Sequence, residues 1–152
     1  MIRLAIFSII IIIITILIHA YGTTRMIRFL FQKIDLETTP IPTKHVLFAL
    51  SFSATCLIMM HFAEIILWAL TYMLIPEISK LSSFQDAVYF SSITYTTVGY
   101  GDITLEGRWR LLCGFEAMNG ILLFGWSSAV FFSIIQRIVS QTKKLSHIIK
   151  KP

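Results

Sequence analysis

One segment of the chain reads Thr94-Tyr95-Thr96-Thr97-Val98-Gly99-Tyr100-Gly101-Asp102. Taken alone, two glycines around a tyrosine would indicate only a tight turn. The preceding residues give the segment a different setting, because Ser83 and Asp86 have the spacing of a capping box at a helix N-terminus. We therefore expect a short helix over residues 84–96 that leads directly into the glycine-containing residues 97–101.

Long apolar segments lie on both sides of this region. Of the 152 residues, 56% are hydrophobic and only 14% are charged, which is typical of an integral membrane protein. Residues 46–75 and 109–139 are each long enough to cross a hydrocarbon core of ~30 Å with some tilt, and residues 1–21 are near the lower length limit. We expect a membrane-spanning helix in each of these places.

Basic residues predict the orientation of these helices. They gather in residues 22–45 and around the tail, residues 140–152, and membrane proteins keep such residues on the cytoplasmic side. The basic residues are Arg25, Arg28, Lys33, Lys44, Arg137, Lys143, Lys144, Lys150 and Lys151. The loop between the second and third segments is then external, and the N-terminus is external if the first segment spans. Two alternatives remain for that segment: a helix lying on the membrane surface, or a cleaved secretory signal, which would invert the orientation.

Residues 22–45 are predicted to be a basic cytoplasmic linker. Apolar residues recur in it at helical spacing, at Met26, Ile27, Leu30 and Ile34. This pattern fits an amphipathic helix lying on the anionic lipids of the inner leaflet. It fits a short extension of the first helix equally well, and both interpretations stay open. Pro40 and Pro42 then break the helix.

The run Thr97-Val98-Gly99-Tyr100-Gly101 resembles the selectivity filter of potassium channels. The resemblance extends over residues 46–139 and implies a tetrameric potassium-channel pore fold within an all-α membrane protein. Its parts are an outer helix (46–75), a pore helix (84–96), the filter (97–101) and an inner helix (109–139), with residues 1–21 as an extra transmembrane or interfacial helix. It further implies a homotetramer in the plasma membrane, or in the inner membrane of a bacterium. This homotetramer would conduct K⁺ passively, with K⁺ as its permeant ligand and no cofactor.

The chemistry of the filter explains its residue types. A potassium ion loses its water shell in a narrow pore, so backbone carbonyl oxygens must replace the water oxygens. Glycine permits the positive φ angles that turn successive carbonyls to one side. A single strand cannot surround an ion, so the mechanism needs four chains around one axis. The predicted K⁺ ligands are the carbonyls of Thr97, Val98, Gly99 and Tyr100.

Residues beside the filter are predicted to support it. Tyr89 and Phe90 match positions that usually hold tryptophan in the potassium-channel family. Tyr89 can still donate a hydrogen bond to Asp102, whereas Phe90 cannot. Ile93 stands where the minimal two-helix bacterial channels carry a glutamate, so we expect no pair of carboxyl groups behind the filter.

The third apolar segment carries Gly120 and Gly125 at the spacing of two inner-helix glycines of the minimal bacterial channels. Gly120 then resembles the family's hinge, although a small residue also permits close helix packing, and both interpretations stay open. If Phe124 faces the pore, a period of 3.6 predicts a cavity-lining face. That face consists of Gly120, Ile121, Phe124, Ser128, Phe131, Phe132 and Ile135. Phenylalanines on such a face can close a pore by dewetting.

Ionisable side chains also occur inside the apolar segments, where they are costly and therefore suggestive. His61 and Glu64 share one helix face, as do Glu116 and Asn119, and the two glutamates lie at similar predicted depths. These residues predict one polar cluster between the outer and inner helices, with the two carboxyl groups close together. The cluster would either join the helices through hydrogen bonds or sense protons.

Other functional classes fit the sequence less well. The histidines His19, His45, His61 and His147 are scattered, and no nucleophile–base set or phosphate loop indicates an enzyme. Cys56 and Cys113 lie in apolar segments, as small buried residues do. The pI of 9.4 comes from residues that flank membrane segments, so nucleic acid is not an expected partner. A potassium transporter subunit and a non-conducting regulatory subunit remain alternatives, and the gating stimulus and any regulatory partner are not predicted.

Overall fold

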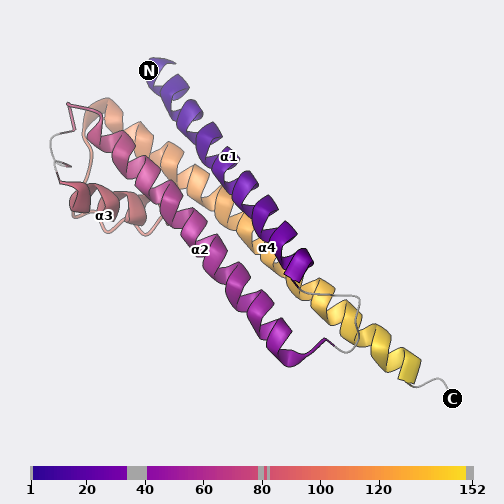
Figure 1. The fold of residues 1–152 in the computed structure, drawn as a ribbon. Coiled ribbons are helices and arrows are strands. Elements are labelled where there is room, and N and C mark those ends of the chain that lie inside the picture. Colours follow the sequence, from indigo (N-terminus) through magenta and orange to yellow (C-terminus); the bar gives the residue numbers. More distant parts are fainter. Residues whose placement is uncertain (1, 34–40, 79–80, 82, 150–152) are drawn as a thin grey trace. The chain divides into compact units, whose positions relative to one another are not determined.

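The computed structural model describes residues 2–33, 41–78, 81 and 83–149. Its helices are α1 (Ile2–Lys33), α2 (Thr43–Met73), α3 (Phe84–Tyr95), the 3₁₀-helix η2 (Gly107–Trp109) and α4 (Arg110–Ile149), as Figure 1 shows. The described residues contain no strand. Ile34, Pro40, Lys150 and Lys151 lie outside them, and so do the side chains of Lys143 and Lys144.

Three helices are long and apolar enough to cross a membrane. Their candidate spans are Leu4–Lys33, Thr43–Met73 and Gly107–Gln141, of 30, 31 and 35 residues. At 1.5 Å per residue, even the shortest measures about 45 Å, which exceeds a hydrocarbon core of ~30 Å. The expected all-α membrane fold is confirmed.

The helix bounds agree with the expected ones where a cap fixes them and differ at several other ends. The pore-helix segment begins as predicted, because the Ser83 hydroxyl accepts a hydrogen bond from the Asp86 backbone N–H (3.0 Å) and donates one to its carboxylate (2.6 Å). It ends at Tyr95, one residue earlier than expected. The second helix ends at Met73, and α4 begins at Arg110 and continues beyond residue 139.

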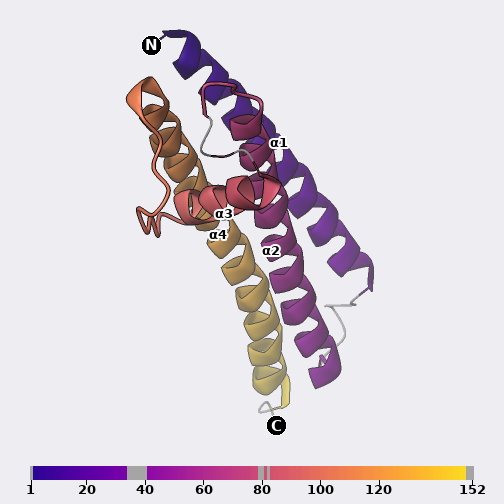
Figure 2. The same ribbon diagram turned by 90° about the vertical axis from the view of Figure 1, so that its left-hand side faces the viewer.

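The chain forms two compact units, which we describe separately. The first consists of Met1–His19 and Met60–Gly125, and the second of Ala20–Met59 and Trp126–Pro152. In the first unit, α3 lies across α2 and α4 rather than along them (Figure 2). Its core combines aliphatic and aromatic side chains: Tyr72 of α2 meets Phe90 of α3 edge to face, with ring centroids 5.2 Å apart. Such a pair stabilises by about 0.5–1.5 kcal/mol beyond its area burial.

The part of α1 in the first unit buries a polar stripe. Ser8, Thr15 and His19 are completely buried, whereas other side chains between and before them are exposed, as lipid-facing side chains are; these are Ile6, Ile9, Ile10, Ile13 and Ile14. Ser8 satisfies its hydroxyl on the carbonyl of Leu4, at 2.9 Å. Together with the buried Leu4 and Ile11, these residues follow one another at intervals of three or four, so a single face of α1 meets the protein.

The part of α1 in the second unit includes residues 22–33 of the predicted linker. The first helix extends to Lys33, and Met26 and Leu30 are each only 4% exposed. This apolar face is therefore covered by protein in this unit. Within this unit the Arg137 guanidinium lies 4.4 Å from the centre of the Phe31 ring, in the range of a cation–π contact.

Candidate functional site

The backbone after α3 has the positive φ angles that the filter interpretation requires. Gly99 and Gly101 have φ of 54° and 81°, and Thr97 also has a positive φ, 62°. The value at Thr97 was not predicted, because a β-branched residue in this region is a genuine outlier. Such strain costs about 1–3 kcal/mol and persists where the surrounding structure imposes it, often at functional sites.

Hydrogen bonds from α3 fix the direction of the filter peptides. The Gly99 N–H donates to the carbonyl of Ile93 at 3.1 Å, and the Thr97 N–H donates to the carbonyl of Thr94 at 3.0 Å. Because a trans peptide points its N–H and C=O in opposite directions, the Val98 carbonyl points away from α3. The side chains of Val98 and Tyr100 are 54% and 73% exposed in the single chain.

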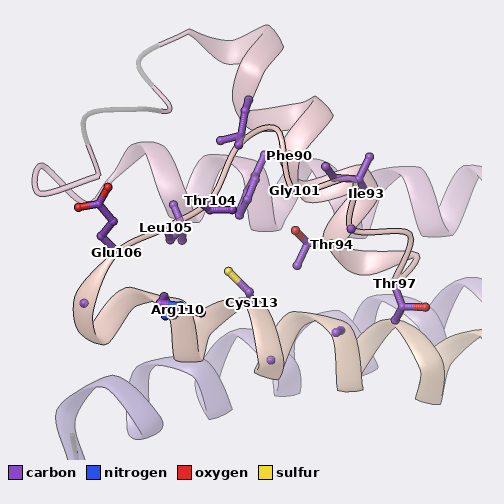
Figure 3. A pocket seen from close by; sticks show the side chains of 15 residues that line it. Phe90, Ile93, Thr94, Thr97, Gly101, Thr104, Leu105, Glu106, Arg110 and Cys113 are labelled. Atoms are coloured by element: carbon purple, nitrogen blue, oxygen red, sulfur yellow. The ribbon is translucent and has the colours of Figure 1, made fainter.

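A cavity of about 920 Å³ adjoins the filter. Its walls are the inward face of α3, the loop that follows the filter and the first turns of α4, as Figure 3 shows. Cys113 points from α4 into this space in the figure, and Thr94 and Phe90 line it from α3. The filter is thus backed by protein at α3 and is open on another side.

The two predicted supporting aromatics have different surroundings. The Tyr89 hydroxyl donates a hydrogen bond to the Asp102 carboxylate at 2.7 Å, which ties α3 to the residue after the filter. Phe90 is buried and packs its ring on Tyr72. Ile93 is buried as well, and its contribution is the carbonyl that holds Gly99.

Gly120 lies in close contact with the end of α3. A Cβ atom placed on Gly120 would lie 2.0 Å from the Tyr95 carbonyl oxygen, so the close-packing interpretation explains why this residue is glycine. Gly120 is buried and therefore does not belong to an open cavity-lining face, which corrects that part of the prediction. At Gly125 an added Cβ would meet no atom within 4 Å.

The remaining residues of the predicted face also differ among themselves. Phe124 is 38% exposed, and its ring centroid lies 4.3 Å from that of His61 and 5.7 Å from that of Tyr95. It therefore packs partly on α2 and α3, instead of pointing wholly away from them. Ile121 is exposed in the first unit, and Ser128 and Phe132 are exposed in the second.

Glu64 is the centre of one buried polar group. Its Oε1 lies 2.8 Å from His19 Nδ1, and its Oε2 lies 3.2 Å from His61 Nδ1. The Tyr95 hydroxyl donates to the same Oε2 at 2.5 Å and lies 3.1 Å from His61 Nδ1. We call His19, His61, Glu64 and Tyr95 the Glu64 centre; it joins α1, α2 and α3.

Glu116 has a separate set of partners. The hydroxyls of Tyr72 and Ser91 each lie 2.5 Å from its carboxyl oxygens. Asn119 instead pairs with Thr15 of α1, donating to its hydroxyl at 2.9 Å and accepting from it at 3.2 Å. The structure thus divides the predicted single cluster, and each glutamate has its own hydroxyl or imidazole partners.

Comparison with protein families places this arrangement. The model of a family described as ion channel, Ion_trans_2, matches residues 45–137, more than half of the chain. The chain belongs to this ion channel family. The family is of the two-helix potassium-channel type, which confirms the resemblance and the channel fold, and the three apolar helices make the channel a multi-pass membrane protein. Comparisons with curated proteins and with solved structures gave no match.

The matched residues include α3, the filter and most of α2 and α4 of the channel, whereas α1 lies outside them. Sequence reasoning missed most partners of the buried glutamates, namely His19, Tyr72, Ser91 and Tyr95, and it missed Thr15 as the partner of Asn119. A signal was available for α1, because Ser8, Thr15, His19 and Thr23 repeat at intervals of seven and four, which is one helix face.

The Tyr89–Asp102 hydrogen bond yields a prediction about pH. This bond is the main cause that holds the pKa of Asp102 below its ordinary value and raises that of Tyr89. Because the bond favours the Asp102 carboxylate, its contribution is present above the ordinary pKa of about 4 and is lost as pH falls through the lower value in the folded channel. At alkaline pH the contribution of this bond is lost only above the ordinary tyrosine pKa of about 10.

Tyr89→Phe removes the hydroxyl that ties α3 to Asp102, so we expect K⁺ flux to decay several-fold faster in this variant. Because the bond in the wild type persists between about pH 5 and 9, the difference should be the same at every pH in this range. The effect is measured in liposomes that are preloaded with K⁺: K⁺ is removed from the outside solution, and the decay of the K⁺ flux is followed in time. Tyr21→Phe, at an exposed tyrosine of the second unit, is the matched control. Equal decay in all three proteins would contradict a supporting role for this bond.

Proposed function

We propose that this chain is a subunit of a potassium-selective channel that conducts K⁺ passively through the backbone carbonyls of residues 97–101. The observation that carries the proposal is the backbone of this segment. Positive φ at Gly99 and Gly101 and the Gly99 N–H bond to Ile93 turn the Val98 carbonyl away from α3. Carbonyls that are turned away from the supporting helix are free to coordinate a dehydrated cation, and K⁺ is then the permeant ligand.

We further propose that the functional unit is a homotetramer in the plasma membrane. One chain supplies one filter strand, and an ion that has lost its water needs oxygens on all sides. The exposed side chains of Val98 and Tyr100 and the open cavity beside the filter support this proposal, because other chains around the filter would cover them. The first half of α1 belongs to the same unit as α3, which supports an N-terminus on the external side together with the filter.

Flux from reconstituted liposomes tests both proposals. We expect K⁺ and Rb⁺ to permeate without an energy source and Na⁺ to permeate at least about 100-fold more slowly, since the filter replaces the hydration shell of the larger ions. Native mass spectrometry of the same preparation should give four chains per particle. Equal permeation of Na⁺ and K⁺ would contradict potassium selectivity, and a stable monomer would contradict the tetramer.

A further inference from the structure

We propose that the Glu64 centre is a regulatory binding site for a divalent transition metal such as Zn²⁺. The donor atoms of His19, His61 and Glu64 all lie within 4.8 Å of one another, and the three residues are buried in the first unit. His19 comes from α1, whereas His61 and Glu64 lie one turn apart on α2, so the meeting of the two helices at this point is a property of the fold. The K⁺ filter does not include them.

The set of donors fits a transition metal better than a hard cation. Zn²⁺ takes imidazole nitrogens and carboxylate oxygens in a tetrahedral arrangement, whereas Mg²⁺ and Ca²⁺ prefer oxygen ligands. The Tyr95 hydroxyl, which already lies next to His61 and Glu64, supplies a fourth donor. Two imidazoles, one carboxylate and one phenol oxygen complete a tetrahedral shell.

The distances are compatible with this shell after a small adjustment. Bonds of about 2.0–2.2 Å place tetrahedral ligands roughly 3.3–3.6 Å apart. His19 Nδ1 lies 2.8 Å from Oε1 of Glu64, and His61 Nδ1 lies 3.2 Å from its other oxygen, Oε2; each distance is within about 0.8 Å of this value. The most widely separated donors, at no more than 4.8 Å, must approach by about 1 Å, which side-chain rotation can supply.

Charge and access also allow metal binding. A carboxylate inside a membrane span is costly without a partner of opposite charge, and a divalent cation provides one. Release of the Tyr95 proton on binding would balance the remaining positive charge, so the occupied site would be neutral. The His61 side chain is 9% exposed, which gives the ion an edge from which to enter.

An ion at this site would act on the filter through Tyr95. Tyr95 is the last residue of α3, it precedes Thr97 by two positions, and its carbonyl touches Gly120. Drawing its hydroxyl toward a metal held by α1 and α2 moves the end of the pore helix. We expect bound Zn²⁺ to reduce K⁺ flux at least several-fold, and only this flux effect depends on the proposed function.

Binding is tested on the purified full-length protein in lipid nanodiscs. Calorimetry should show one Zn²⁺ per chain and no heat of binding for Mg²⁺. Co²⁺ bound in place of Zn²⁺ should give the strong visible absorption of tetrahedral coordination. His19→Gln and His61→Gln should each weaken Zn²⁺ binding by about 100-fold or more. Loss of a residue that only hydrogen-bonds to a metal ligand costs up to about 100-fold in affinity, and loss of the ligand itself should cost at least as much. His45→Gln, at a histidine outside the centre, is the matched control and should bind as the wild type does.

Three results would overturn the site. These are weak, octahedral-type absorption of Co²⁺, unchanged Zn²⁺ affinity in both His19→Gln and His61→Gln, or equal loss in His45→Gln. If one variant does not fold, the other variant and the wild-type Co²⁺ spectrum still decide. Intact K⁺ flux without Zn²⁺ binding would reject the metal site alone, whereas Zn²⁺ binding without K⁺ flux would reject the conduction proposal alone.

Discussion

Replacing Gly99 with alanine is expected to reduce K⁺ flux by more than about 100-fold. At a φ of 54°, an alanine costs about 1–2 kcal/mol, and the four chains of the proposed tetramer multiply this to about 4–8 kcal/mol. Each 1.4 kcal/mol changes an equilibrium constant tenfold. The strained filter conformation is then much less populated than one in which the peptides have rotated. Rotation of the Gly99 peptide removes its bond to Ile93 and turns the Val98 carbonyl from the ion. Liposome K⁺ flux at equal protein density measures the loss.

Gly107 offers a matched control for this strain. Its φ is 58°, and like Gly99 it would place an added Cβ more than 4 Å from any other residue. It lies in η2, after the filter. Gly107→Ala should therefore cost similar stability and leave flux within about twofold of the wild type, because its strain is borne outside the ion path. Equal losses in both variants would show that strain in the loop, and not the filter carbonyls, controls flux.

Gly120→Ala should have the largest effect on stability. The added Cβ would lie 2.0 Å from the oxygen and 2.9 Å from the carbon of the Tyr95 carbonyl. The added Cβ is fixed to the backbone of α4 and the Tyr95 carbonyl to the backbone of α3, so neither group can rotate away from the other. Overpacking of this kind costs about 1–3 kcal/mol or more, which corresponds to a fall in melting temperature of about 2–12 °C for a chain of this length. Thermal unfolding of the purified protein in detergent measures it.

Gly125→Ala separates packing from hinge motion. Gly125 lies on the same helix with no atom within 4 Å of an added Cβ, and alanine is the better helix former by about 0.5–1 kcal/mol. It should leave the melting temperature unchanged or slightly raised. If Gly120→Ala instead unfolded like the wild type and changed only channel opening, the hinge interpretation would be right and the packing interpretation wrong.

Local chemistry made part of the channel readable from sequence. The capping box at Ser83 and the glycines at 99 and 101 act on their own backbone, so their effects do not depend on distant residues. Apolar length alone predicted the spans, because a bilayer sets the same requirement for every helix. These features located α3 and the beginnings of the long helices within a few residues, whereas α1 and α4 continue ten or more residues beyond their predicted ends at 21 and 139, to Lys33 and Ile149.

Contacts between helices were not readable in the same way. His19 meets Glu64 only because α1 packs on α2, and spacing within one helix does not name the facing residue on another. The predicted orientation of Phe124 differs from the structure for this reason. A helical period defines a face of a helix but not which residues cover that face. His61 and Tyr95 cover part of the face that includes Phe124. Met26 and Leu30 are an apolar face that suits lipid and protein equally, so pattern alone left two answers.

The buried polar stripe of α1 has a consequence for biosynthesis. Glu64, the partner of His19, follows it by 45 residues in the sequence, whereas Asn119, the partner of Thr15, follows by 104. During translation α1 therefore reaches the bilayer well before its second partner is made, with a hydroxyl and an imidazole on one face. We expect α1 and α2 to leave the translocon as a pair, and α4 to complete the assembly last.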